Sequence, residues 1–165
     1  MLQATFTIES QVIGIILEAL KTLRYLPGPP IGEELVVLGM QERIIKMLKH
    51  AKAFIFLLRD LTTLEALITF ASWTHLNIHH KLISLLNANN FYDGLIAFIN
   101  HVIKNHFISY TVKKIFICAS TANELLDLLE AYKLELDPKI LTLDWSTDNG
   151  HGSSNKHKWD LCLCL

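Results

Sequence analysis

The chain alternates short apolar runs with longer segments in which apolar residues recur every three or four positions. Runs of β-branched and aromatic residues predict strands, and the longer spacing predicts helices. We expect strands at residues 12–16, 35–38, 53–57, 82–86 and 115–119, and helices at residues 41–49, 63–76, 91–107 and 121–133. Strands that alternate with helices in this way predict an α/β fold with a doubly wound parallel sheet.

The segment AFIFLLRDLTTLEALITFASW, residues 53–73, contains the junction around which the rest is organised. It predicts a strand, a turn at residues 58–62 and a helix that starts near Thr63. In a parallel sheet such a junction binds ligands, because the N–H groups at the start of the helix favour an anion. A turn that cradles a phosphate is normally rich in glycine, since bare backbone can approach a ligand closely. This turn has no glycine, so the sequence predicts a nucleotide site with altered chemistry.

Composition excludes several classes of protein. Of the 165 residues, 51% are hydrophobic and 19% are charged, which indicates one packed domain. The net charge of −1 gives no basic footprint for nucleic acid or an anionic membrane. No uncharged apolar run has the length of a membrane span, no secretory signal is evident, and three cysteines make no disulfide framework. We therefore expect a reduced cytoplasmic protein, with the nucleus as a second location.

Histidines and cysteines offer only weak metal sites. His75 and His79 are four residues apart and could share a helix face, but no carboxylate stands at ligand spacing, and a polar helix end that also includes His80 explains them without a metal. Cys162 and Cys164 lack further ligands. Cys118 lies in an apolar run and is expected in the core. We expect neither a metal nor a cofactor.

Two polar clusters can also be explained without a ligand. Glu42 and Arg43 follow the strand at 35–38 and are typical of a solvated charge pair. Thr62 and Thr63 precede a helix that carries Glu65, a pattern typical of an N-cap with a carboxylate in the first turn.

The order of short motifs along the chain is nevertheless familiar. VIGII, MQER, AFI, TTLE, SWTHLNIHHK, LLN, FY, FI and ASTANEL follow one another, and together they resemble the LONELY GUY family. The resemblance covers residues 12–132, with residues 1–11 unmatched, a family-like domain at 12–133 and a flexible tail at 134–165. It implies a Rossmann-like fold, an oligomer, and hydrolysis of the N-glycosidic bond of a cytokinin riboside 5′-monophosphate to free base and ribose 5-monophosphate.

The family hallmark is a PGGxGTxxE turn and helix with an arginine from an upstream M-H-x-R-K segment. Arg43 and Thr63 match the hallmark, whereas Gln41 and Ile44 replace its histidine and lysine, Leu58 its proline, Arg59, Asp60 and Thr62 its glycines, and Ala66 its glutamate. Glu65 lies one residue earlier and should point elsewhere, because each residue turns a helix by about 100°. The resemblance assigns catalysis to Arg43 and the Ala66 position, and substrate binding to Tyr25, Arg43, Ile44, Asp60, Leu61, Thr62, Thr63, Leu64, Glu65, Ala66 and Ser72.

These departures predict a truncated and degenerate copy without catalysis. The front of the family domain has no counterpart before residue 12, so we expect a sheet that is incomplete at its N-terminus. Two alternatives to an active enzyme are a non-catalytic subunit, which pairs with intact relatives through the helix bearing Trp73 and the apolar stripe at 91–107, and a residual module for a nucleoside 5′-monophosphate. A degenerate product of marginal stability is the third.

Overall fold

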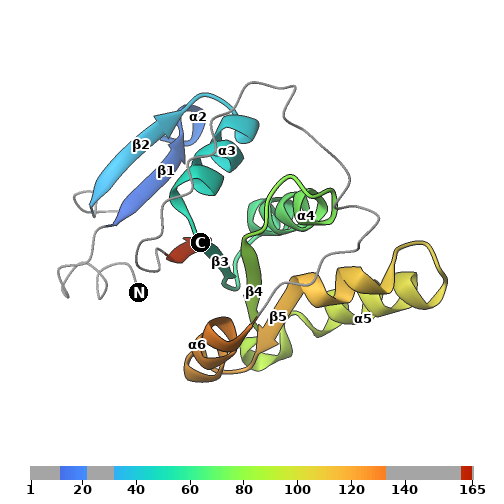
Figure 1. The fold of residues 1–165 in the computed structure, drawn as a ribbon. Coiled ribbons are helices and arrows are strands. Elements are labelled where there is room, and N and C mark those ends of the chain that lie inside the picture. The colour runs from blue at the N-terminus through green and yellow to red at the C-terminus, as the bar shows by residue number, and fades with distance from the viewer. Residues whose placement is uncertain (1–11, 22–31, 133–160, 165) are drawn as a thin grey trace. The chain divides into compact units, whose positions relative to one another are not determined.

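The computed structural model describes residues 12–21, 32–132 and 161–164 (Figure 1). The chain divides into two compact units, Met1–His50 and Ala51–Leu165. Both units combine parallel strands with helices, which confirms the Rossmann-like α/β class. The described strands form two parallel sheets, one in each unit.

The first unit contains a parallel pair of strands. Strands β1 (Ile13–Leu17) and β2 (Glu33–Val37) are followed by helices α2 (Glu18–Lys21) and α3 (Met40–His50), respectively. The two strands and the helix predicted here are confirmed to within two residues at each end. Gly32 has a φ of 79°, and a Cβ there would lie 2.3 Å from the carbonyl oxygen of Val12, so only glycine can lead into β2.

The second unit contains a four-stranded parallel sheet in the order β5-β4-β3-β6. Its strands are β3 (Ala53–Phe56), β4 (Leu82–Leu86), β5 (Phe116–Ala119) and β6 (Leu161–Cys164). Helices α4 (Leu61–His75) and α6 (Ala122–Ala131) lie on opposite sides of β4 (Figure 1). The strand predicted at 82–86 is confirmed residue for residue, and those at 53–57 and 115–119 are each one residue shorter. Ile115 belongs instead to the 3₁₀ helix η2 (Tyr110–Ile115).

Strand β6 lies within the segment that was expected to be a flexible tail. It pairs in parallel with β3, with Ala53 opposite Leu161 and Phe56 opposite Cys164. The run Leu-Cys-Leu-Cys is apolar, as suits a strand that adds to the edge of a buried one. Residues 1–11, 22–31, 133–160 and 165 lie outside the described residues, and with them most of the predicted loop at 21–32 and most of the predicted tail.

Strand β3 is buried along its whole length because helices cover both faces of the sheet. On one face, Ala53, Ile55 and Leu57 join a core with α6 and β5, to which Ile117, Ala119, Leu125 and Leu129 belong. On the other face, Phe54 stacks on Phe70 of α4, with ring centroids 4.0 Å apart. Two apolar layers therefore fix the strand after which the candidate turn begins.

Helix α5 (Asp93–Lys104) follows a 3₁₀ turn, η1 (Ala88–Asn90), and differs most from expectation. It is shorter than the predicted 91–107, and none of its residues is buried. The apolar stripe is present but stays accessible: Phe98 is 63% exposed, and the flanking Phe91 and Phe107 are 50% and 79% exposed. None of the helices that the structure describes combines the length and apolar character needed to cross a bilayer.

The expectation that Cys118 belongs to the core is wrong, because its side chain is exposed. Strand β5 is an edge strand, and Ile117 and Ala119 occupy the face that packs against α6, so Cys118 points the other way. Partial burial, Asp93 and Glu124 raise the pKa of the Cys118 thiol. The sequence carried no signal for which β5 residue would lack cover.

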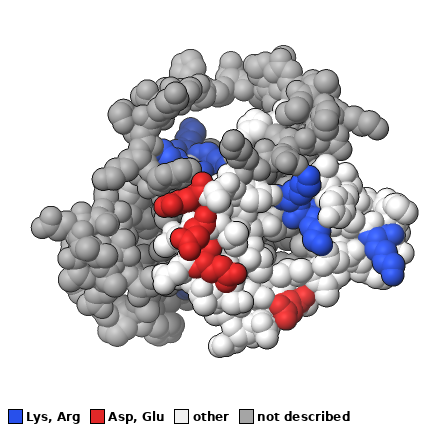
Figure 2. All heavy atoms as spheres, turned by 60° about the horizontal axis from the view of Figure 1, so that its bottom comes forward, with Lys and Arg blue, Asp and Glu red and all other residues white. Residues whose placement is uncertain are grey.

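Thr121 caps α6 as predicted, but the reciprocal bond of the predicted capping box is displaced by one residue, because Glu124 accepts from Ser120 and not from Thr121. The Thr121 hydroxyl accepts a hydrogen bond from the N–H of Glu124 (3.3 Å), and the Glu124 carboxylate accepts one from the N–H of Ser120 (3.2 Å). In Figure 2, acidic side chains gather over α6, whose exposed residues include Glu124, Asp127 and Glu130. This face repels anions, so an anionic ligand is expected elsewhere.

Candidate functional site

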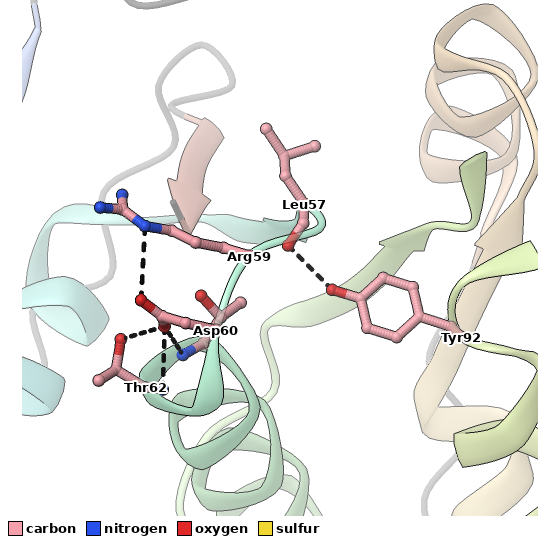
Figure 3. A network of polar contacts seen from close by, with 6 residues as sticks. Leu57, Arg59, Asp60, Thr62 and Tyr92 are labelled. Atoms are coloured by element: carbon pink, nitrogen blue, oxygen red, sulfur yellow. Dashed lines mark hydrogen bonds and ion pairs between the residues drawn. The ribbon is translucent and has the colours of Figure 1, made fainter. Parts of the chain in front are cut away.

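Helix α4 begins at Leu61, two residues before the predicted start, because Asp60 caps it. Asp60 has extended backbone (φ −130°, ψ −174°), and its Oδ1 accepts hydrogen bonds from the N–H groups of Thr62 (3.0 Å) and Thr63 (3.2 Å). The Thr62 hydroxyl donates a third bond to the same oxygen at 2.6 Å. Figure 3 shows these contacts at the top of the helix. The predicted N-cap is therefore present, but Asp60 supplies it instead of a threonine.

Arg59 adds a positive charge to the same turn. Its Nε lies 3.6 Å from Oδ2 of Asp60, and both side chains are more than half exposed (Figure 3). The hydrogen bond from the Thr62 hydroxyl, backed by the N–H groups of Thr63 and Thr62 and by Arg59, lowers the pKa of Asp60. Asp60 is thus an anion at neutral pH, at a position where the resemblance predicts a glycine.

The remaining predicted residues of α4 are scattered around the helix. Leu61 and Ser72 are exposed, Leu64 is half-buried, and Ala66 is only 1% exposed. Thr63 is 4% exposed, and its hydroxyl has no hydrogen-bond partner among the described residues. One oxygen of the half-buried Glu65 carboxylate is likewise buried without a partner there. The structure thus brings Asp60, Thr62 and Thr63 together, whereas Ser72 and Ala66 do not join them.

A polar network holds the turn in place from the side of β4 and β5. The fully buried Tyr92 donates a hydrogen bond from its hydroxyl to the carbonyl oxygen of Leu57 (2.9 Å), directly before the turn (Figure 3). Asn87 accepts the Tyr92 N–H at 2.7 Å and donates from its own N–H to the Ala119 carbonyl at 2.8 Å. Asn87 also donates from its amide to Asp93 (2.8 Å). This network fixes the carboxyl ends of three strands relative to one another.

Asn87 and Tyr92 belong to the LLN and FY motifs, which carry the resemblance but were not predicted as part of the site. Their signal was available: a polar residue directly after an apolar strand, and an aromatic residue with a hydroxyl before a helix. We assign them to the support of the turn.

The first unit contains the predicted residues of the M-H-x-R-K segment. The Nε of Arg43 donates to the carbonyl oxygen of Ile15 at 3.4 Å, which ties α3 to β1. Ile44, where the resemblance predicts a lysine, is completely buried, so the structure gives it a packing position. Glu42 accepts a hydrogen bond from the N–H of Leu38 at 3.1 Å, a local contact at the start of α3. Tyr25 lies outside the described residues.

Both ring nitrogens of His79 are engaged in hydrogen bonds within the fold. Its side chain is 5% exposed, Nε2 lies 3.1 Å from the carbonyl oxygen of Phe70, and Nδ1 accepts the N–H of Lys81 at 3.1 Å. Desolvation lowers its pKa to about 4, an effect to which the charges of Lys81 and His80 add. His79 is therefore neutral, with the proton on Nε2. In the described part of the chain, no three or more His, Cys, Asp or Glu side chains come together as metal ligands would.

These features define a class before any comparison. Parallel strands and a central strand buried on both faces, followed by a turn and a helix that Asp60 caps, make an α/β protein with a strand-turn-helix junction. The sequence matches the family described as "Possible lysine decarboxylase" over residues 1–129. This match includes residues 1–11, which the resemblance by motifs left unmatched.

Similar proteins make the family more specific. A probable cytokinin riboside 5′-monophosphate phosphoribohydrolase of Oryza sativa subsp. japonica is 37% identical over 149 residues, which are 90% of this chain and 69% of that protein. A cytokinin riboside 5′-monophosphate phosphoribohydrolase of Arabidopsis thaliana is 41% identical over 121 residues, 73% of this chain and 56% of that protein. Another of Oryza sativa subsp. japonica is 40% identical over 126 residues, 76% of this chain and 52% of that protein. The chain belongs to the LONELY GUY family and spans about half to two thirds of the length of these relatives.

Proposed function

We propose that this chain is a catalytically inactive member of the cytokinin riboside 5′-monophosphate phosphoribohydrolase family. The observation that carries the proposal is Ala66. It stands at the position that the resemblance gives to the catalytic glutamate, and it is a buried methyl group without acid-base chemistry. Removal of one group that stabilises charge in a transition state typically costs about 10²–10³ in rate.

Glu65 does not replace the missing carboxylate. It lies one residue earlier on α4, so it leaves the helix about 100° away from the Ala66 side chain. One of its oxygens is enclosed without a hydrogen-bond donor among the described residues. A carboxylate held in that way is not poised over a ribose that would bind at the first turn.

The turn supports the same proposal. Glycines would leave bare backbone at positions 59, 60 and 62, whereas this chain has Arg59, Asp60 and Thr62 there. The Asp60 carboxylate is negative at neutral pH and repels a nucleotide phosphate. Arg59 offsets this only in part, because its guanidinium faces solvent.

Steady-state hydrolysis of isopentenyladenosine 5′-monophosphate tests the proposal. The Arabidopsis relative serves as the positive control in the same buffer and at the same protein concentration. We expect release of free base by this chain to be at least about 10³-fold slower than by the relative, since both the carboxylate and the turn are altered. Release at the relative's rate would overturn the proposal.

Helix α5 favours a second function, that of a non-catalytic subunit. No residue of the helix is buried, and its stripe presents Phe98 to solvent beside Phe91 and Phe107. Contiguous apolar surface of this kind marks interaction sites. We propose that the chain associates through α5 with a second family member, in a homo- or hetero-oligomer. Co-expression with a tagged full-length relative supports this if the two chains purify at a fixed ratio, and contradicts it if they separate.

We also propose that the chain retains a nucleotide-binding module. The Thr63 hydroxyl supports this, since it has no hydrogen-bond partner among the described residues. In that case the chain would bind a nucleoside 5′-monophosphate without cleaving it. For location we propose the cytoplasm, with the nucleus as a second compartment. A fluorescent fusion tests this, and a signal confined to any other compartment would contradict it.

A further inference from the structure

The first turn of α4 offers what an anion needs. The leading N–H groups of a helix have no partner within the helix and carry partial positive charge, so helix starts bind phosphates and carboxylates. Here, the N–H groups of Thr62 and Thr63 and the hydroxyl of Thr62 converge on one point, at distances of 3.0, 3.2 and 2.6 Å from a single oxygen. That oxygen belongs to the chain itself, since it is Oδ1 of Asp60.

We infer that Asp60 is a built-in anion, which occupies the anion site of α4 and excludes a phosphate group through an intramolecular contact. The carboxylate does what one edge of a phosphate would do: it accepts the same donors and carries negative charge at the positive end of the helix. Its second oxygen lies beside Arg59, 3.6 Å from Nε. The inference deepens the proposed function and depends on it only for the kind of ligand, a nucleotide phosphate.

Thr63 adds a polar group to the same turn that Asp60 leaves unsatisfied. Its hydroxyl is on the same first turn, the residue is 4% exposed, and the oxygen has no partner among the described residues. A buried hydroxyl without a partner is costly and calls for an explanation. Asp60 satisfies the N–H of Thr63 but not its hydroxyl. A phosphate has more oxygens than a carboxylate, so it offers acceptors for both.

A plain helix cap is the competing explanation, because aspartate is among the preferred N-cap residues. The two explanations differ in what replacement of Asp60 does to anion binding. Asp60→Gly removes the charge and frees the N–H and hydroxyl of Thr62, whereas the N–H of Thr63 keeps its bond to the carbonyl oxygen of residue 60 (3.2 Å). Glycine at an N-cap costs little stability. Asp60→Ser removes the charge as well, but its hydroxyl still caps the helix. Comparison of the two variants therefore separates occupation of the donors from simple repulsion.

The test is titration of the full chain and both variants with inorganic phosphate and with adenosine 5′-monophosphate, followed by the amide NMR signals of Thr62 and Thr63. We expect Asp60→Gly to bind on the order of ten-fold more tightly than the unaltered chain, with Asp60→Ser in between, as one charge-assisted hydrogen bond would give. Equal binding by glycine and serine variants would overturn occupation of the donors, and no gain in either variant would overturn the inference as a whole.

Hydrolysis measured on the same samples keeps the two proposals apart. Tighter phosphate binding by Asp60→Gly without release of free base supports both the inference and the inactive enzyme. Release of base by the unaltered chain would contradict the proposed function, whatever the binding data show. Failure of Asp60→Gly to bind would contradict only the inference.

Discussion

The hydroxyl of Tyr92 donates a hydrogen bond of 2.9 Å to the carbonyl oxygen of Leu57 and so ties the segment after β4 to the turn after β3. Both residues are buried, and Asn87 holds the backbone of Tyr92 in turn. The scaffold that positions the turn is therefore well packed, although the turn lacks the glycines that the resemblance predicts. The residues that hold the turn in place, Tyr92 and Asn87, are therefore different from the residues of the turn itself.

Tyr92→Phe removes only the oxygen that holds Leu57. The buried carbonyl then lacks this donor, and we expect the free energy of unfolding to fall by about 1–2 kcal/mol. Urea unfolding followed by circular dichroism measures it. Tyr110→Phe is the control, because Tyr110 is 62% exposed, and it should leave stability unchanged. Equal effects of the two substitutions would contradict the role of Tyr92.

His79 makes stability depend on pH in a defined window. The pKa of His79 is about 4 in the folded chain, against an ordinary value of 6.5. Between pH 4 and pH 6.5 the histidine is therefore protonated in the unfolded state and neutral in the folded state. Stability should fall by up to about 3 kcal/mol as the pH drops from 6.5 to 4, and this residue adds no slope above 6.5.

Unfolding free energies at a series of pH values check this window. His79→Gln should remove that part of the slope, although it also lowers stability at every pH through the lost hydrogen bonds to Phe70 and Lys81. His80→Gln, at an exposed neighbour, should keep it. An unchanged slope in His79→Gln would show that other groups cause the acid sensitivity.

Ala66→Glu introduces the glutamate that the resemblance predicts at this position, but it does not change the surroundings. The position is 1% exposed, so a carboxylate there is desolvated, and we expect a loss of about 2–3 kcal/mol in unfolding free energy with no gain in hydrolysis. Ser72→Glu, at an exposed position of the same helix, should change stability by less than about 0.5 kcal/mol. A stable and active Ala66→Glu variant would show that the lost carboxylate alone silences the chain.

Phe98→Asp tests whether the α5 stripe is an interface. A charge in the middle of an apolar contact opposes association, so the variant should shift toward monomer in analytical ultracentrifugation. Ala97→Asp adds the same charge at an exposed position beside the stripe and should retain the oligomer. Equal masses for the unaltered chain and Phe98→Asp would contradict the second proposed function.

The sequence predicted most of the fold because each buried strand is a short apolar run between polar turns. Residues 82–86 appear as β4 without change. Helix α5 was less predictable, since periodicity shows that a stripe exists but not whether anything covers it. Cys118 was predicted wrongly for a related reason: the local pattern does not show whether another element covers the second face of a strand.

The candidate site was predictable in its location and less so in its geometry. The strand-turn-helix junction at residues 53–73 is confirmed, and the lack of glycine pointed to altered chemistry. The role of Asp60 was not predicted. Thr62 and Thr63 were expected to cap the helix, but Asp60 is the cap and both threonines donate hydrogen bonds to its carboxylate. Which of several neighbouring residues caps a helix depends on their backbone angles, and the residue types alone do not specify these angles.

We propose that this chain does not cleave the nucleotide, and a single-turnover experiment decides whether it does. Purified chain in excess is mixed with radiolabelled isopentenyladenosine 5′-monophosphate, quenched over a day and separated by chromatography. The account predicts that the nucleotide stays intact, at the level of a sample without protein. Stoichiometric conversion to isopentenyladenine and ribose 5-monophosphate would contradict it and would mean that an altered turn and Ala66 still support catalysis.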